Sequence, residues 1–216
     1  MTSILSLQEM TGEHWERVNA ALYQGGLVVL PADTVYGLAC LATIPEAVER
    51  IYEVKGRSHD KPLALMFTSV KEVFGVIADL PEAIKAALEA LLPGPVTAII
   101  PFEDGTGGIH ARGAGGIGIR IIPPPMGEIY RLMAGPLVVT SANLSGQPDA
   151  SLVSDIPVSV LEACDFVIDG GRSGHRQPST VVDLRPLAAG AAPVILREGA
   201  LARRVIEERL GRRQGA

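Results

Sequence analysis

The feature that most constrains the fold of this chain is the shape of its apolar runs, which are short and end in Gly, Pro or small polar residues. Short apolar runs between turn residues are typical of buried β-strands. Longer segments with apolar residues at helical spacing lie between several of them. The alternation is irregular, so the sequence predicts an α/β or α+β domain with about seven strands and five or six helices around a mixed sheet.

The expected elements follow from these patterns. Strands are expected at 27–30, 62–67, 96–101, 117–122, 137–139, 166–169, 179–184 and 193–197. Helices are expected at 14–24, 45–55, 69–78, 80–94 and 128–133, and as a C-terminal helix at about 200–212. The helix at 45–55 is the best defined, because Pro45 suits a first turn and Gly56 suits a C-terminal stop.

Composition and charge limit the class of protein. With 216 residues and 47% apolar content, the chain can bury a full core in one domain. Its net charge of -5 argues against a broad basic surface for nucleic acid. The N-terminal segment does not resemble a secretion signal and no segment predicts a membrane span, so we expect a cytoplasmic protein. The isolated Cys40 and Cys164 suggest neither a disulfide framework nor a zinc site.

One segment departs from the acidic balance: Lys55, Arg57 and Lys61 fall within seven residues. Three like charges this close repel one another, and Lys and Arg are the usual partners of phosphate oxygens. A loop that leaves a helix through Gly56 and enters a strand at Pro62 can turn these side chains toward one point. The segment is either an anion-binding loop or a solvated basic loop balanced by its acidic neighbours.

Polar residues also flank several predicted strands. TSANLSG at 140–146 supplies hydroxyls and an amide, and PADTVYGL at 31–38 places Asp33 in a turn. PSTVVDL begins a strand with Ser179, and VILREG ends one with Arg197. Strand ends are where α/β proteins assemble sites, and such loops can hold phosphate, ribose or carboxylate. Each segment taken alone is also compatible with an ordinary turn.

Motifs that would define other functions are absent from the sequence. There is no GxxxxGK[ST] phosphate loop and no GxSxG motif, and GAGGIGIR does not open a helix as a dinucleotide fingerprint does. The four histidines are scattered without metal-ligand spacing, so no protein-held metal is predicted. With few aromatic residues, the chain offers no evident stacking face for RNA.

Taken in order, PADTVYGL, KGRSHDKPLAL, LLPGPVT, GIGIRII, TSANLSG, PSTVVDL and LREG resemble the YrdC-like family of threonylcarbamoyl-adenylate synthases. The resemblance covers about residues 25–199, and the ordered set with KxRxxxKPL and SANxSG is specific. It implies a single α/β domain over residues 1–216, with a twisted mixed sheet flanked by helices and a basic concave cavity. The chain stops at residue 216, so the single-domain form of the family is expected.

The resemblance also implies a reaction. Family members are nucleotidyltransferases that use L-threonine, bicarbonate or CO2, and ATP to make threonylcarbamoyl-adenylate and pyrophosphate for the threonylcarbamoyladenosine of transfer RNA. By resemblance, the catalytic cations would be Lys55 and Arg57. The remaining nucleotide-binding residues would be Lys61, Asn143, Ser151 and Arg197. The threonine-binding residues would be Thr34, Arg120, Ser141 and Ser179.

Such a reaction needs no nucleophilic side chain. A carbamate made from the amine of threonine and CO2 attacks the α-phosphate, so the protein must align two anions and neutralise charge on the leaving pyrophosphate. Arg120 would pair with the carboxylate of the amino acid. Mg2+ would travel on the nucleotide rather than in a protein cage. The expected partner is the transferase complex that moves the product onto transfer RNA, and transfer RNA itself is a candidate contact.

Some details depart from the family pattern. Met66 stands where many synthases carry a His near threonine, and the GGIGIR approach to Arg120 is rich in glycine. Two other functions stay open: a non-catalytic module that binds double-stranded RNA in the same concavity, and a paralogue that carbamoylates or adenylates another small acceptor. The Gly-rich stretch at 105–116 predicts a lid over the site.

Overall fold

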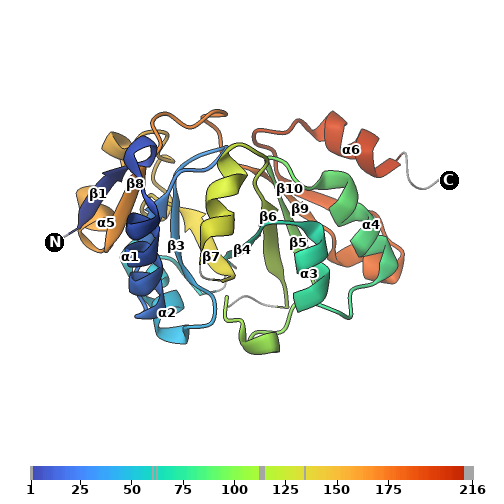
Figure 1. The fold of residues 1–216 in the computed structure, drawn as a ribbon. Coiled ribbons are helices and arrows are strands. Elements are labelled where there is room, and N and C mark those ends of the chain that lie inside the picture. The colour runs from blue at the N-terminus through green and yellow to red at the C-terminus, as the bar shows by residue number, and fades with distance from the viewer. Residues whose placement is uncertain (1, 60, 62, 112–114, 134, 212–216) are drawn as a thin grey trace.

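The computed structural model describes residues 2–59, 61, 63–111, 115–133 and 135–211. Within these residues, ten strands form one sheet in the order β1-β8-β2-β3-β7-β4-β6-β5-β9-β10. Figure 1 shows the sheet running across the molecule from β1 at one end to β10 and α6 at the other. The strands are β1 (Ser3–Ser6), β2 (Val28–Leu30), β3 (Gly37–Leu41), β4 (Ala64–Phe67), β5 (Val96–Ile100), β6 (Ile117–Ile121), β7 (Leu137–Ser141), β8 (Phe166–Asp169), β9 (Thr180–Asp183) and β10 (Val194–Arg197).

The strands of the described part are connected by α-helices and short 3-10 helices. The α-helices are α1 (Gly12–Tyr23), α2 (Pro45–Lys55), α3 (Val70–Val76), α4 (Glu82–Leu91), α5 (Val158–Glu162) and α6 (Arg203–Gly211). The 3-10 helices are η1 (Leu7–Glu9), η2 (Thr106–Gly108), η3 (Met126–Leu132), η4 (Val153–Asp155) and η5 (Arg185–Ala189). The α2 helix begins at Pro45 and is closed by Gly56, whose φ of 56° lies in the left-handed region.

The sheet is mixed, as the irregular alternation predicts. The pairs β1/β8, β2/β8, β4/β6 and β5/β9 are parallel, and the pairs β2/β3, β3/β7, β4/β7, β5/β6 and β9/β10 are antiparallel. Because side chains alternate along a strand, each central strand presents two different faces. On β5, Val96 and Ala98 belong to the larger apolar core, whereas Thr97 and Ile99 line a cavity on the opposite face.

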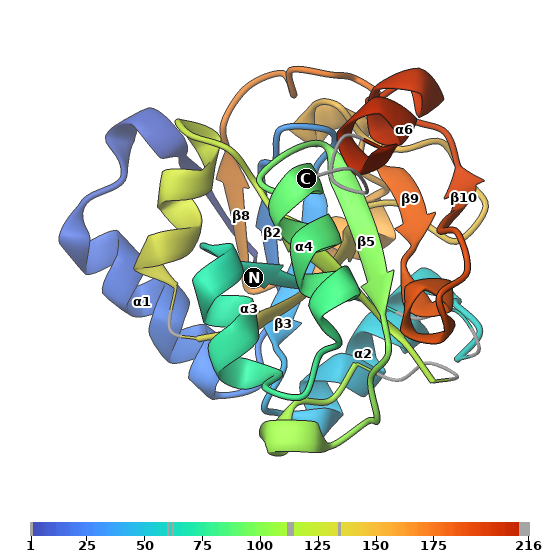
Figure 2. The same ribbon diagram turned by 90° about the vertical axis from the view of Figure 1, so that its right-hand side faces the viewer.

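The two faces of the sheet are covered unequally. Helices α2 to α6 each contribute buried side chains to the larger core, among them Ile51 of α2 and Ile84 of α4. On the other face, α1 and η3 cover a smaller core through residues such as Val18 and Tyr130. Figures 1 and 2 show α1 near one end of the sheet, with α3, α4 and α6 toward the other. The part of the second face that α1 and η3 leave uncovered becomes the cavity described below.

Four elements differ from the sequence-based prediction. Strands β1 and β3 and helix α5 were not expected, since the sequence around β3 was interpreted as a loop, and the segment expected as a helix at 128–133 is the 3-10 helix η3. Strand β1 pairs in parallel with β8, more than 150 residues away, so no local sequence pattern predicts it. No helix within the described residues is long and apolar enough to cross a membrane. The expected lid includes residues 112–114, which lie outside the described part, so it stays a prediction.

Candidate active site

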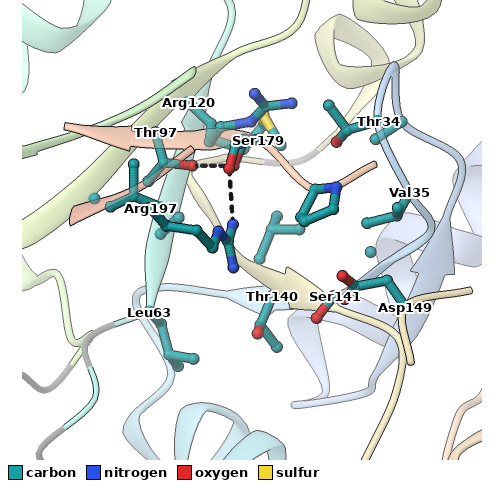
Figure 3. A pocket seen from close by; sticks show the side chains of 18 of the residues that line it. Thr34, Val35, Leu63, Thr97, Arg120, Thr140, Ser141, Asp149, Ser179 and Arg197 are labelled. Carbon is teal, nitrogen blue, oxygen red and sulfur yellow. Dashed lines mark hydrogen bonds between the residues drawn. The ribbon is translucent and has the colours of Figure 1, made fainter. Parts of the chain in front are cut away.

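A cavity of about 370 Å³ lies on the open face of the sheet, over the central strands (Figure 3). Among the described residues its lining carries four cationic side chains and one carboxylate, together with several hydroxyl groups. The polar and charged lining residues are Thr34, Tyr36, Arg57, Lys61, Thr97, Arg120, Thr140, Ser141, Asp149, Ser179 and Arg197. This composition suits a small anionic ligand with hydrogen-bonding groups.

Two glycines leave space for the cavity above the sheet. Gly37 of β3 and Gly118 of β6 both line it. A Cβ atom on Gly118 would lie 2.7 Å from Cγ2 of Thr97, and one on Gly37 would lie 2.7 Å from Cγ1 of Val139. Neither position has room for a side chain. Close packing of β6 against its neighbouring strands therefore explains Gly118, one of the glycines that precede Arg120 in the sequence.

The structure brings most of the predicted site residues together. Seven of the ten line the cavity: Thr34, Arg57, Lys61, Arg120, Ser141, Ser179 and Arg197. The other three, Lys55, Asn143 and Ser151, are not part of its lining. These residues are far apart in the sequence. Arg120, Ser141 and Arg197 lie on β6, β7 and β10, Ser179 immediately precedes β9, and Thr34, Arg57 and Lys61 lie on the loops before β3 and β4.

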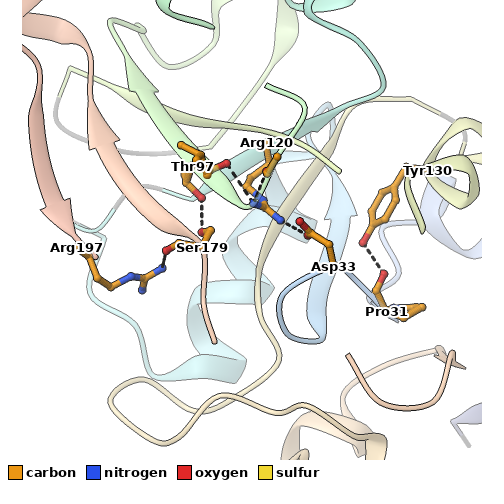
Figure 4. A network of polar contacts seen from close by, with 9 residues as sticks. Pro31, Asp33, Thr97, Arg120, Tyr130, Ser179 and Arg197 are labelled. Carbon is orange, nitrogen blue, oxygen red and sulfur yellow. Dashed lines mark hydrogen bonds and ion pairs between the residues drawn. The ribbon is translucent and has the colours of Figure 1, made fainter. Parts of the chain in front are cut away.

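Arg120 is the most deeply held cation of the cavity. Its Nη2 lies 2.5 Å from Oδ1 of Asp33, and its Nη1 donates to the carbonyl oxygens of Gly94 (3.1 Å) and Val96 (3.2 Å). Both side chains of the ion pair are more than nine-tenths buried. Figure 4 shows Asp33 directed at the guanidinium from the loop after β2, with Tyr130 donating to the carbonyl oxygen of Pro31 nearby. The guanidinium is therefore fixed in place before any ligand arrives.

A second polar group lies beside Arg120 (Figure 4). The hydroxyl groups of Thr97 and Ser179 are 2.7 Å apart, and Nη2 of Arg197 donates to the carbonyl oxygen of Ser179 at 2.9 Å. Burial lowers the pKa of Arg197, with Asp149 opposing that shift and Arg120 adding to it. These groups therefore act on one another electrostatically across the cavity.

Lys55 was expected on the cavity surface and is instead buried behind it. Its ammonium donates to the carbonyl oxygens of Ser141 and Asn143 and, at 3.2 Å, to Oδ1 of Asn143. The backbone N–H of Ser145 also donates to the carbonyl oxygen of Lys55 at 2.8 Å. Burial lowers the pKa of Lys55 to about 8, Arg57 adding to the shift and Asp149 opposing it. In this structure Lys55 holds the loop after β7 in place.

Asn143 and Ser151 also differ from their expected positions. Asn143 is buried, accepts from the hydroxyl of Ser141 at 2.5 Å and donates to the carbonyl oxygen of Gln147 at 2.6 Å. The hydroxyl of Ser151 lies 3.2 Å from Oδ2 of Asp155 and accepts from Arg172 at 3.3 Å. Both side chains are engaged by the protein, so a nucleotide contact by either one stays a prediction.

Sequence reasoning missed several residues of the cavity. Thr97 points from the predicted strand at 96–101 into the cavity, and period-two alternation along that strand could have identified it. Thr140 belongs to the polar segment noted at 140–146, but it was not named as a site residue. Asp33 was noted only as a turn residue, and nothing in its surroundings in the sequence signals an ion pair with Arg120. Asp149 stands in no motif. Among the described residues, no three His, Cys, Asp or Glu side chains are grouped to hold a metal ion.

The fold and the cavity define a class: an α/β protein with an open mixed sheet whose polar strand ends converge on one small-molecule site. A family model described as Telomere recombination, for Sua5, YciO and YrdC proteins, matches residues 20–199. The chain belongs to this family.

Individual relatives agree with this assignment. Threonylcarbamoyl-AMP synthase of Pyrococcus abyssi is 30% identical over 213 residues, covering 98% of this chain and 62% of that protein. The structure of P. abyssi Sua5 complexed with L-threonine has a TM-score of 0.79 at 27% identity, covering 98% of this chain and 61% of that one. Escherichia coli YciO has a TM-score of 0.78 at 22% identity over 95% of this chain and 98% of its own, which shows the shared fold alone. This chain thus spans about three-fifths of the length of the P. abyssi protein.

Proposed function

We propose that this protein is an L-threonylcarbamoyl-adenylate synthase, a nucleotidyltransferase that joins L-threonine, bicarbonate or CO2, and the adenylyl group of ATP, and releases pyrophosphate. The observation that carries the proposal is the convergence of Arg57, Lys61 and Arg197 with Arg120 and Ser179 on one cavity. The names of the relatives support it, as does the threonine bound by P. abyssi Sua5. In this account residues 1–216 act as a single catalytic domain.

The chemistry requires two anions to be brought together. The amine of threonine adds to CO2 with loss of a proton, which gives a carbamate. A carbamate oxygen then bonds to the α-phosphorus of ATP while the bond from that phosphorus to the bridging oxygen of pyrophosphate breaks. Both reactants are negatively charged, so alignment and charge neutralisation by fixed cations are the main contributions of the protein.

We assign the two ends of the cavity to the two reactants, ATP and the amino acid. Arg57 and Lys61 come from the segment between α2 and β4, and they are assigned to the ATP phosphates together with Arg197. Arg120 and Ser179 lie deeper beside β5 and are assigned to the amino acid, with the carboxylate of threonine on the guanidinium. Thr34 and Ser141 complete the amino-acid end.

Lys55 receives a different assignment from the one the family resemblance implies. Because its ammonium is bound to the loop that carries Ser141 and Asn143, we assign it to positioning that loop rather than to direct phosphate contact. Mg2+ would arrive on ATP and shield charge on the phosphates. The product is an activated mixed anhydride, so a transferase must accept it promptly. We place that partner and its transfer RNA substrate with this enzyme in the cytoplasm.

Pyrophosphate release tests the proposal. The chain is incubated with ATP and Mg2+, with and without L-threonine and bicarbonate, and pyrophosphate is measured. Release should require both added substrates and should fall strongly in Arg57→Ala, whereas Lys71→Ala, which removes an exposed cation outside the cavity, should match the wild type. Release that ignores threonine would point to a paralogue with another acceptor, and no release at all would contradict the proposal.

A further inference from the structure

One carboxylate lies among the cations of the cavity. Asp149, on the loop between β7 and η4, is half-buried and is the only acidic residue in the described lining. Figure 3 shows it beside Ser141, on the side of the cavity opposite Arg197. Within the described part of the chain it makes no hydrogen bond or ion pair, unlike Asp33, which is committed to Arg120. Its interactions with the cations of the site are therefore electrostatic and not direct.

An unpaired carboxylate is unfavourable in a cavity that takes a triphosphate. ATP brings several negative charges of its own, and like charges in a partly desolvated site repel strongly. Asp149 does favour the charged forms of Lys55 and Arg197, but it makes no hydrogen bond or ion pair with either side chain. Its repulsion toward ATP would be relieved by a cation lying between the carboxylate and the phosphates.

Mg2+ has the matching requirements. In nucleotide sites it keeps several waters and is usually held by one or two carboxylates together with the phosphates of the substrate, rather than by a protein cage. The described residues offer no group of three potential metal ligands, but they do offer this one carboxylate at the cavity wall. A single protein oxygen is enough when the nucleotide supplies the others.

We propose that Asp149 is the protein ligand for the divalent cation that arrives on ATP, either directly or through one of the waters of the cation. The inference rests on the proposed function, because it needs ATP in the cavity. In this proposal the divalent cation takes part in nucleotide recognition, because Asp149 attracts the metal-bound nucleotide and repels the metal-free one. Metal dependence of binding is therefore its specific signature.

The test is equilibrium binding of the analogue α,β-methylene-ATP, which cannot release pyrophosphate, measured by calorimetry in Mg2+ and again in EDTA. Wild type is compared with Asp149→Asn and with Asp79→Asn, a matched change at an exposed carboxylate outside the cavity. Asp149→Asn should weaken binding of the Mg2+ complex by on the order of 10-fold. The same variant should bind the metal-free analogue more tightly than wild type, because the repulsion is gone. Asp79→Asn should match wild type in both conditions.

A second readout does not depend on affinity. With Mn2+ in place of Mg2+ and the analogue at saturation, water-proton relaxation reports how many exchangeable waters remain on the metal. A direct Asp149 ligand predicts a larger relaxation enhancement in Asp149→Asn than in wild type. An unchanged enhancement together with the affinity crossover would assign the contact to a bridging water, which the proposal includes.

Three results would overturn the inference. Equal metal dependence in wild type and Asp149→Asn would exclude the carboxylate as a cation ligand. Equal weakening of both nucleotide forms would instead identify Asp149 as an acceptor for ribose hydroxyl groups. No binding of the analogue by wild type in either condition would overturn the proposed function, and this inference with it. As a control, circular dichroism and thermal unfolding are measured to check that each variant is folded.

Discussion

Asp33 and Arg120 form a buried ion pair of 2.5 Å at the inner wall of the cavity, with the guanidinium also bound to two carbonyl oxygens of the chain around β5. The pair joins the loop after β2 to β6, two segments that are separated in the sheet by β3, β7 and β4. It therefore fixes this wall of the cavity, to which we assign the amino acid, to both halves of the sheet. The second oxygen of Asp33 is buried and has no hydrogen-bond partner within the described residues.

Removing one partner of this pair should destabilise the fold. Asp33→Ala leaves the Arg120 guanidinium buried without its counter-charge, which typically costs about 3 to 5 kcal/mol. The double variant Asp33→Ala, Arg120→Met removes both charges and should be less destabilised than the single variant. Urea unfolding of the four members of this mutant cycle measures the effect. A single variant as stable as wild type would show that the pair is not an effective constraint.

Lys55 predicts a specific dependence of stability on pH. Its pKa is lowered to about 8 in the folded protein, below the value of about 10.4 typical of an unfolded chain. Between these two pH values the unfolded chain binds a proton that the folded chain has released, so the free energy of unfolding rises with pH, by up to about 3 kcal/mol. Below pH 8 this contribution is constant.

The measurement compares wild type with Lys55→Met, which lacks the titrating group. The difference in free energy of unfolding between the two proteins should change in favour of wild type as pH rises from about 8 to about 10.4. Other titrations largely cancel in this difference. A difference that stays flat through the window would show that the Lys55 ammonium is not perturbed by burial.

Gly118 should not tolerate a methyl group. The added Cβ in Gly118→Ala would lie 2.7 Å from Cγ2 of Thr97, whose hydroxyl is paired with Ser179. We expect a loss of stability of about 1 to 3 kcal/mol and a raised KM for threonine, because the residues that we assign to the amino acid must move. Gly75→Ala is the control, since nothing lies near its added Cβ. A KM unchanged in Gly118→Ala would remove this part of the floor from the threonine site.

Met66 should govern the size of the amino acid that is accepted. It lies opposite Arg120 in the β4/β6 register and lines both the main cavity and a neighbouring one of about 200 Å³. Met66→Ala should join the two cavities and lower the preference for threonine over a larger amino acid, by on the order of 10-fold in the ratio of kcat/KM values. Met66→Leu, which conserves volume, should keep the preference. Equal selectivity in wild type and Met66→Ala would contradict this role.

The sequence predicted those elements that carry local signals. Helix α2 has its expected bounds, because Pro45 and Gly56 act within one turn of its ends. Strand β1 was missed because only its pairing with β8 makes it a strand. The segment of η3 has helical composition, but it adopts a 3-10 helix that begins directly after Pro125. Mixed sheet topology was predictable from irregular alternation, whereas the order of ten strands was not.

The site was predictable in kind more than in detail. Cations and hydroxyl groups at strand ends gather as expected, and Arg57 and Lys61 reach the cavity. The ammonium of Lys55 binds the loop after β7, and that loop is distant from Lys55 in the sequence. The motif places Lys55 next to Arg57 but does not reveal that only the Arg57 side chain reaches the cavity. Asp149 could not be identified from the sequence for the same reason, since only the folded chain brings it close to the cations of the cavity.

Direct detection of the product tests the central claim most sharply. The protein is incubated with ATP, Mg2+, L-threonine and carbon-13 bicarbonate, and the mixture is quenched and analysed by mass spectrometry. The account predicts an adenylate that contains threonine and one carbon-13 atom, formed together with pyrophosphate and strongly reduced in Arg57→Ala. An adenylate without the labelled carbon, or none at all while ATP is bound, would contradict it.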